Sequence, residues 1–248
     1  MPMPCNVMDD LVGARIASLP EDAFYIADFI TAEEEEMLLQ RITTVPLPRW
    51  THLSHRRLQT WPSALTKSNT LLSAPLPSWL VSPIITPRFD SLGIFADAPH
   101  RAPNHVLVNE YRPGQGIMPH EDGAAYYPLV ATVSLGASIV LDLYPKGQQR
   151  GRGDDGDDGQ RPQYRILQER RSLLITKKKI YTEFLHGIAE TSKDECLDAD
   201  SICNWDLLRE PDRYRCGWAE RETRISLTYR DVLKVAKVGN TMKFLGGR

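Results

Sequence analysis

Residues 109–123 read Asn109-Glu-Tyr-Arg-Pro-Gly-Gln-Gly-Ile-Met-Pro-His120-Glu-Asp122-Gly, and we expect the other strands of the chain to be arranged around this segment. Asn109 and Tyr111 share one face of a predicted strand, and the Pro and Gly residues that follow are typical of a turn. The turn leads into a second extended segment, in which His120 and Asp122 point to the same face because they are two residues apart. An imidazole and a carboxylate so placed can bind one metal ion together.

A third candidate ligand, His186, lies far downstream in Phe184-Leu-His-Gly-Ile, an apolar run that also predicts a strand. Two imidazoles and one carboxylate, with three positions left open, are the ligand set of non-haem Fe(II) oxygenases. His-x-Asp also occurs by chance in many chains, and a single downstream histidine is more often a surface or core residue. The three residues alone therefore leave both alternatives open.

The segment from Arg224 to Arg230, Arg-Ile-Ser-Leu-Thr-Tyr-Arg, alternates polar and apolar residues as a strand does. Its polar face carries Arg224, Ser226, Thr228 and Arg230. By itself the pattern is typical of an amphipathic strand with its polar face in water. Beside a candidate metal site, the planar fork of an arginine also suits a dicarboxylate co-substrate.

In this order, the motifs resemble the AlkB family of Fe(II)- and 2-oxoglutarate-dependent dioxygenases. Three stretches look most like the subgroup known as AlkB homologue six: Asn104-His-Val-Leu-Val-Asn-Glu-Tyr, Gly116-Ile-Met-Pro-His-Glu-Asp-Gly and Ser134-Leu-Gly. The likeness extends from Phe29 to about Tyr229, with lapses between residues 147 and 162 and between 191 and 220.

The resemblance implies Fe(II), 2-oxoglutarate and O2 as cofactor and co-substrates. It assigns the iron to His120, Asp122 and His186. It places the distal carboxylate of 2-oxoglutarate on Arg224, with help from Tyr111, and sets Asn109 and Arg230 around the other end of the co-substrate or the metal-binding aspartate. Ser226 departs from the asparagine of the bacterial founder of the family, although its hydroxyl can still donate a hydrogen bond.

The implied activity is oxidative demethylation or hydroxylation of a substrate, with succinate and CO2 as products. Methylated single-stranded DNA or RNA is the substrate class that the resemblance favours, but the core motifs do not specify it. The alternatives are a nucleic-acid- or protein-binding module with little or no catalysis, and a protein hydroxylase.

The resemblance also predicts the fold, a mostly β (α+β) double-stranded β-helix, which is a jelly-roll-type barrel with flanking helices and an N-terminal lid. Periodicity alone predicts only a mixed, strand-rich chain. We expect a loose lead-in over residues 1–20, one dioxygenase domain over 21–232 and a tail over 233–248. Within the domain, residues 21–103 would form the N-terminal extension and lid, and 104–232 the catalytic core.

The N-terminal extension contains a segment, residues 48–61, that mixes tryptophan with basic residues. Arginines contact phosphates and aromatic rings stack on unpaired bases, so a lid of this kind can hold a flipped base. The more common alternative is a loop that covers the barrel, with its tryptophans buried and its arginines solvated. Candidate substrate residues, including a tyrosine pair after the His-x-Asp motif, are Trp50, Arg56, Arg57, Trp61, Tyr126 and Tyr127.

Several other segments predict local structure but contain no candidate catalytic residues. Thr31 and Glu34 form a predicted capping box at the start of a helix, and residues 78–81 predict a single helical turn. The Gly- and Asp-rich residues 147–161 predict a flexible loop, and residues 177–179 a basic turn that can touch a phosphate. Residues 191–220 show no clear periodicity and predict an insertion or loop.

The composition of the chain limits its domain size, its possible partners and its cellular compartment. With 248 residues, 42% of them hydrophobic, the chain is long enough for one domain with a substantial core. Its formal charge of −2 gives no global basic field, so nucleic-acid binding would need a local basic patch. Four cysteines without paired spacing predict reduced thiols, and no signal peptide or membrane-spanning run is seen. We therefore expect an intracellular monomer in the cytoplasm, the nucleus or both.

Overall fold

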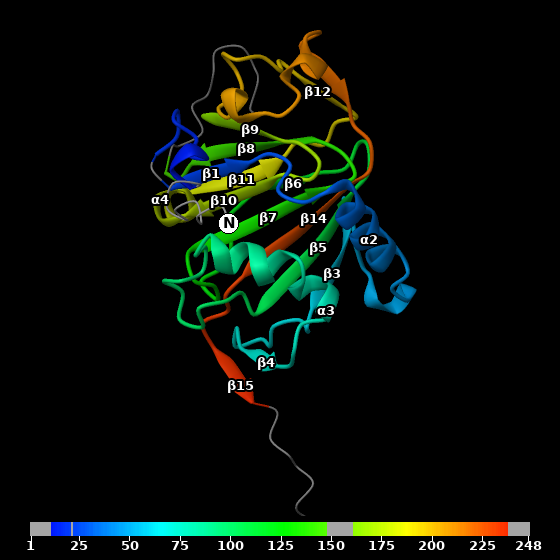
Figure 1. Ribbon diagram of the computed structural model, residues 1–248, viewed down its shortest axis with the longest axis vertical. Helices are drawn as coiled ribbons and strands as arrows, with labels where there is room; N and C mark the ends of the chain where they lie inside the picture. The colour runs from blue at the N-terminus through cyan, green and yellow to red at the C-terminus, as the bar shows by residue number, and fades with distance from the viewer. Residues whose placement is uncertain (1–10, 21, 148–160, 238–248) are drawn as a thin grey trace, which may run out of the picture.

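The fold is a barrel of two facing β-sheets, described here from a computed structural model for residues 11–20, 22–147 and 161–237 (Figure 1). The larger sheet has seven strands in the order β1-β10-β7-β14-β5-β3-β2. These strands are β1 (Ala23–Ile26), β2 (Thr51–Leu53), β3 (Arg56–Trp61), β5 (His105–Tyr111), β7 (Leu129–Leu135), β10 (Leu173–Lys177) and β14 (Arg224–Arg230).

The smaller sheet has four strands in the order β6-β11-β8-β9. They are β6 (Ile117–His120), β8 (Ile139–Pro145), β9 (Tyr164–Gln168) and β11 (Phe184–Ile188). From β5 onward the chain passes repeatedly between the sheets, with β5, β7, β10 and β14 in the larger one and all of the smaller sheet's strands between them. This alternation of strands between two facing sheets confirms the predicted double-stranded β-helix.

The two-residue period of each strand separates the inside of the barrel from its outer core. On β14, Ile225, Leu227 and Tyr229 pack into the core between the larger sheet and the helices. Arg224 and Arg230, on the opposite face, line the interior cavity. The predicted division of this strand into a polar and an apolar face is therefore confirmed.

The outer face of the larger sheet is covered by helices from the N-terminal third of the chain (Figure 1). These are α2 (Ala32–Thr43), α3 (Ser78–Val81) and the short η2 (Ile84–Phe89). The predicted capping box at the start of α2 is present, because the Thr31 hydroxyl accepts from the Glu34 amide and the Glu34 side chain accepts from the Thr31 amide. Leu38 and Ile42 on α2 are fully buried against the sheet. The period-3.6 apolar stripe thus fixes the helix on this face.

Residues 191–220, for which the sequence predicted only an insertion or loop, are ordered over the outer face of the smaller sheet. They contain β12 (Lys193–Glu195), η3 (Trp205–Leu207), η4 (Pro211–Tyr214) and β13 (Trp218–Glu220). The Asn204 side chain is buried and exchanges two hydrogen bonds with the backbone of Leu167 on β9, at 2.8 and 2.9 Å. Ile16 and Leu19 are buried in the same core, so residues 11–20 of the expected loose lead-in are packed against the barrel.

The remaining elements lie at the edges of the barrel. After η1 (Leu47–Arg49), strands β2 and β3 form an antiparallel hairpin that extends the larger sheet beyond β5. The segment expected to form a basic turn after β10 instead begins α4 (Lys178–Glu183). β15 (Val235–Lys237), in the expected tail, pairs in parallel with β4 (Leu71–Ser73).

Most of the predicted acidic loop, residues 148–160, lies outside the described residues. In the described part of the chain, Cys196, Cys203 and Cys216 are free thiols. No helix there is both long enough and apolar enough to span a bilayer.

Candidate metal and co-substrate site

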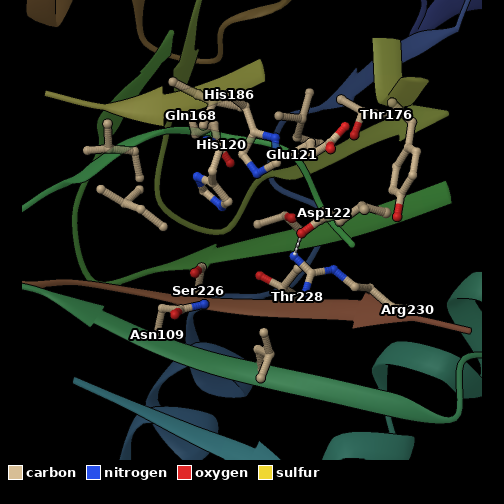
Figure 2. Close-up of a pocket in the computed structure, with 18 of the residues that line it drawn as sticks. Asn109, His120, Glu121, Asp122, Gln168, Thr176, His186, Ser226, Thr228 and Arg230 are labelled. Carbon is tan, nitrogen blue, oxygen red and sulfur yellow. Dashed lines mark ion pairs between the residues drawn. The ribbon is translucent and has the colours of Figure 1, made fainter. Parts of the chain in front are cut away.

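A cavity of about 330 Å³ lies between the two sheets of the barrel. Figure 2 shows how side chains from facing strands converge on it, with His120 and His186 on one side and Asn109, Ser226 and Arg230 on the other. The alternate residues of each strand supply its walls, because only every second side chain points inward. Its volume is at the lower end of the range of roughly 300 to 1,000 Å³ that is usual for small-molecule sites.

His120, Asp122 and His186 come together in this cavity. Their ligating atoms all lie within 4.8 Å of one another. His120 and His186 are direct partners on the antiparallel strands β6 and β11, with ring centroids 4.3 Å apart. Asp122 differs from the expected extended strand, because β6 ends at His120 and the carboxylate is carried by the loop that follows. The sequence thus predicted the grouping, and the loop brings the third ligand into place.

The imidazoles of His120 and His186 are both neutral at neutral pH, as metal ligands must be. Burial lowers the pKa of His186 to about 4 and also lowers the pKa of His120, so each ring has a free lone pair at neutral pH. His120 Nδ1 lies 2.9 Å from the Met118 carbonyl oxygen, which can only accept, so Nδ1 carries the proton and Nε2 is free for a metal. Two neutral imidazoles and a carboxylate with open positions are a donor set that fits Fe(II).

Arg230 holds Asp122 from the opposite sheet. Its Nη2 lies 2.5 Å from the Asp122 carboxylate, an ion pair drawn in Figure 2, and both side chains are more than nine-tenths buried. The guanidinium also lies over the Tyr126 ring, with its Cζ 4.9 Å from the ring centroid. Because a second oxygen of Asp122 remains available, this pair orients the carboxylate without removing it from the metal position.

Arg224 is a buried cation that has no anionic partner in the described part of the chain. Its side chain is 2% exposed, and its Nη2 donates to the neutral oxygens of Ser134 at 2.8 Å and Gln168 at 3.0 Å. Its Nε is buried with no hydrogen-bond partner among the described residues. Burial lowers the pKa of Arg224 to about 10, so the group stays charged at neutral pH. An unpaired buried cation facing a cavity fits a ligand carboxylate, as the distal end of 2-oxoglutarate would supply.

The other predicted co-substrate residues line the same cavity. Asn109 and Tyr111 on β5 face inward, and their direct neighbours on β14 are Ser226 and Arg224. Burial raises the pKa of Tyr111, so its phenol remains a neutral hydrogen-bond donor beside Arg224. All three of Asn109, Tyr111 and Ser226 line the cavity where a co-substrate would bind. Their contacts with the co-substrate remain predictions.

The predicted substrate residues divide into two groups. Arg56 and Tyr126 line the cavity. Trp50 is 6% exposed in the helix-covered core, and Tyr127 packs against that core. Trp50, one of the two candidate base-stacking tryptophans, is therefore buried away from the cavity, as the more common alternative for this segment expects.

The hairpin β2-β3 explains where the other two residues point. Arg57 and Trp61 lie on the face of β3 opposite to Arg56 because side chains alternate along a strand. Arg57 forms two hydrogen bonds with Glu110, at 2.8 and 2.5 Å. Trp61 makes an edge contact with Trp79, with ring centroids 5.8 Å apart. These side chains support the sheet and do not form the cavity wall.

Gln168 and Tyr181 are among the cavity residues that were missed from the sequence. Gln168 ends β9 and accepts a hydrogen bond from Arg224, and Tyr181 reaches the cavity from α4. A polar residue directly after the apolar pair Ile166 and Leu167 was the only signal for Gln168. Tyr181 gave none, because α4, the helix that presents it, was not predicted.

Comparisons with known proteins agree with this geometry. The family model described as the 2OG-Fe(II) oxygenase superfamily matches residues 22–230. The chain is 37% identical over 233 residues to "Probable RNA/DNA demethylase ALKBH6" of Danio rerio, and the match covers 94% of this chain and 95% of that protein.

Solved structures resemble the fold at low sequence identity. "The structure of OsALKBH1" superposes with a TM-score of 0.52 at 14% identity, covering 86% of this chain and 98% of that one. An oxidoreductase of the 2OG-Fe(II) oxygenase family from Burkholderia pseudomallei superposes with a TM-score of 0.53 at 13% identity, covering 94% and 98%. Both likenesses support the double-stranded β-helix as the fold.

Proposed function

The chain belongs to the 2OG-Fe(II) oxygenase superfamily, in its AlkB-like branch, and from this premise we propose that it oxidatively demethylates nucleic acid. As a member of that superfamily it is an oxidoreductase that uses Fe(II), 2-oxoglutarate and O2. The nucleic-acid substrate is the step that we add. The similarity to a probable RNA/DNA demethylase along nearly the whole of both chains is the observation that carries it.

The cavity residues have separable tasks in this function. His120, Asp122 and His186 would hold the iron, and Arg230 would keep the Asp122 carboxylate oriented. Arg224 would bind the distal carboxylate of the co-substrate through its unpartnered Nε, while Ser134 and Gln168 fix the other side of its guanidinium.

Apolar side chains exclude bulk water from the reacting groups. Leu141 and Leu143 from the smaller sheet, and Val130 and Leu174 from the larger one, complete the cavity walls. In such a low-dielectric site the charge of Arg224 acts strongly on a bound carboxylate. The protein thereby contributes orientation, charge and exclusion of water, and the bound iron and co-substrate supply activation of O2.

The overall reaction is balanced without any further reductant. One oxygen atom of O2 enters the succinate formed from 2-oxoglutarate as CO2 is released, and the other converts an N-methyl group into N-hydroxymethyl. The hydroxymethyl group then leaves as formaldehyde, and the proton of its hydroxyl group passes to the nitrogen of a neutral base or, from a cationic base, to solvent.

The proposal is tested by succinate formation from 2-oxoglutarate with the iron-loaded protein, in the presence and absence of methylated single-stranded oligonucleotides. We expect one or more oligonucleotides to raise succinate and to release formaldehyde in equal amount. His120→Ala and Asp122→Ala should abolish both products, because neither variant has a complete ligand set. A surface variant such as Lys67→Ala serves as the matched control.

Two other outcomes would contradict the proposal in different ways. Succinate formation that no oligonucleotide changes would preserve the oxygenase and direct the search to proteins or small molecules. Wild-type succinate formation by Asp122→Ala would overturn the assignment of the metal site itself.

A further inference from the structure

The charges that line the cavity are not balanced. Within the described parts of the chain, its charged side chains apart from histidine are Arg56, Glu121, Asp122, Arg224 and Arg230. Asp122 is paired with Arg230 at 2.5 Å, and Glu121 forms an ion pair with Lys146. Arg56 and Arg224 are left without a carboxylate partner.

Arg56 differs from Arg224 because the family resemblance assigns it no contact with the co-substrate. It begins β3, faces the cavity and is partly buried. Its Nε is buried without a hydrogen-bond partner, and it forms no ion pair with a described residue. Its neighbour Arg57, on the opposite face of the same strand, is satisfied by Glu110.

The charge of Arg56 acts on the groups around the candidate metal. Burial raises the pKa of Tyr111 and lowers that of His120, and the charge of Arg56 partly offsets the first effect and adds to the second. The guanidinium therefore lies within electrostatic range of one candidate iron ligand and of one wall of the co-substrate site. Arg56 is therefore placed to act on whatever part of a substrate approaches His120.

The sum of the charges in the cavity with Fe(II) and 2-oxoglutarate bound also points to Arg56. The two carboxylates of 2-oxoglutarate offset the two charges of Fe(II), while the Asp122–Arg230 and Glu121–Lys146 pairs are each neutral. Two positive charges remain, on Arg224 and Arg56. A substrate that carries a further positive charge would enter a cavity whose net charge already repels it.

We propose that Arg56 makes this enzyme selective for neutral methylated bases that present a carbonyl oxygen, and selects against cationic methylated bases. The inference rests on the proposed function and deepens it. A guanidinium offers only donors, so it can bind a carbonyl beside the methylated nitrogen but not an exocyclic amino group. Charge and hydrogen bonding therefore favour the same class of base.

Matched pairs of bases separate this selectivity from size and methyl position. 1-Methylguanine and 1-methyladenine are purines methylated at the same nitrogen, but the first is neutral with a carbonyl and the second is cationic with an amino group. 3-Methyluracil and 3-methylcytosine form the pyrimidine pair, in which both bases have a carbonyl at position 2 and differ in charge and in the carbonyl or amino group at position 4. Each base is placed singly in the same single-stranded oligonucleotide, and the unmodified sequence reports binding through the backbone alone.

Two readouts are measured with the full-length, iron-loaded protein. One is the Kd of each oligonucleotide under anaerobic conditions with 2-oxoglutarate present, where turnover cannot begin. The other is kcat/KM for succinate formation in air. We expect both to favour the neutral member of each pair by about tenfold or more, the discrimination that one well-placed arginine contact supplies.

Variants at position 56 assign the selectivity to this side chain. Arg56→Gln should bring the two members of each pair to within about twofold, and Arg56→Lys, which keeps the charge, should retain most of the preference. Arg112→Gln is the matched control, because it removes an arginine whose side chain is 61% exposed just beyond β5. The Kd for 2-oxoglutarate checks that the site of each variant is intact.

The possible outcomes distinguish this inference from the proposed function. Equal use of cationic and neutral bases by the wild-type protein would overturn the selectivity and leave the demethylase intact. An unchanged preference in Arg56→Gln, with weaker 2-oxoglutarate binding, would assign Arg56 to the co-substrate and also overturn it. If no oligonucleotide stimulates succinate formation, the proposed function fails and the inference with it.

Discussion

Arg224 is the largest fully buried side chain of the described structure, and its surroundings predict how tightly the co-substrate binds. Gln168 approaches it with a neutral oxygen at 3.0 Å. Gln168→Glu would place a carboxylate there, which would pair with Arg224 and compete with the distal carboxylate of 2-oxoglutarate. We expect the Kd for 2-oxoglutarate to rise about tenfold or more, with a smaller change in kcat.

Isothermal titration of the Mn(II)-loaded protein with 2-oxoglutarate measures this effect without turnover. Gln163→Glu is the control, because it adds the same charge at an exposed position just before β9. A wild-type Kd in Gln168→Glu would show that Arg224 does not receive the co-substrate carboxylate.

Asp142, which does not line the cavity, predicts how the stability of the fold depends on pH. The residue is 7% exposed, and burial raises its pKa from 3.8 to about 6, an effect that the nearby charge of Arg165 only partly offsets. Arg165 Nε lies 3.5 Å from Asp142 Oδ1, an ion-pair distance that leaves this oxygen without a hydrogen bond. Because the folded pKa exceeds the unfolded one, ionising Asp142 destabilises the fold as pH rises from about 4 through 6.

Asp142→Asn should therefore stabilise the protein by roughly 2 to 3 kcal/mol at pH 7 to 8 and by nearly nothing below pH 4. Urea unfolding at several pH values measures the difference, and the exposed Asp200→Asn serves as the control. A gain that is constant with pH would contradict the titration of Asp142 and indicate a packing effect. Asp194 and Arg221, the other charged groups that influence this carboxyl, are unchanged in the variant.

At the level of single residues, local spacing made His120, Asp122 and His186 candidate metal ligands, and the family resemblance assigned the iron to them. His120 and Asp122 are two residues apart, and His186 lies in an apolar run. Trp50 shows the limit of such reasoning. An aromatic residue between arginines suits either a base or a core, and only the tertiary contacts bury this one under Arg57, whose Cζ lies 4.1 Å from its ring centroid.

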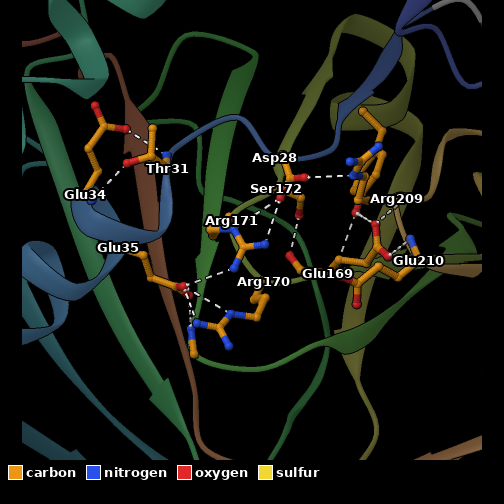
Figure 3. Close-up of polar contacts among 12 residues, drawn as sticks. Asp28, Thr31, Glu34, Glu35, Glu169, Arg170, Arg171, Ser172, Arg209 and Glu210 are labelled. Carbon is orange, nitrogen blue, oxygen red and sulfur yellow. Dashed lines mark hydrogen bonds and ion pairs between the residues drawn. The ribbon is translucent and has the colours of Figure 1, made fainter. Parts of the chain in front are cut away.

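Among the elements, helix α2 is joined to the barrel by an ion-pair cluster shown in Figure 3. The Glu35 side chain is 1% exposed and accepts hydrogen bonds from Arg170, at 2.5 and 3.1 Å, and from the Gly136 amide at 2.8 Å. Gly136 lies in the β7-β8 turn and Arg170 in the β9-β10 turn. A single carboxylate thus ties one helix to two turns at the end of the barrel.

Glu35→Ala should lower the free energy of unfolding by about 3 kcal/mol, the lower end of the range for breaking a buried pair, because the 45% exposed Arg170 can regain water. Urea unfolding measures this loss. Glu36→Ala, one residue along on the exposed side of the same helix, should change stability by less than about 0.5 kcal/mol. Equal losses in the two variants would mean that helix propensity, and not the cluster, is responsible.

The elements that could be predicted are those whose signals are local. The capping box of α2 and the polar and apolar faces of β14 depend on neighbouring residues, and both are confirmed. Residues 191–220 could not be predicted because their order depends on distant contacts, such as those of Asn204 with β9. The hairpin β2-β3 likewise becomes part of the larger sheet only through pairing with β5.

At the scale of the whole molecule, the interior cavity lies between the two sheets. Each sheet is built from strands that are far apart in the sequence. Two of the candidate iron ligands come from the smaller sheet, whereas the arginines lie on the larger one. Metal and co-substrate would therefore connect the two sheets. Ligands that bind only the folded barrel must stabilise it as a unit, by a free energy that grows with the logarithm of their concentration relative to Kd.

Thermal unfolding tests this connection. At 100 times Kd, a ligand adds about 2.7 kcal/mol, which raises the Tm of a domain of this size by roughly 5 to 10 °C. We expect Mn(II) to raise the Tm of the wild-type protein and 2-oxoglutarate to raise it further only when metal is present, because chelation requires the ion. In His186→Ala the metal-dependent shift should largely disappear, whatever the Tm of the unliganded variant. A full shift in that variant would place the metal elsewhere, and a shift by 2-oxoglutarate without metal would mean that Arg224 alone captures the co-substrate.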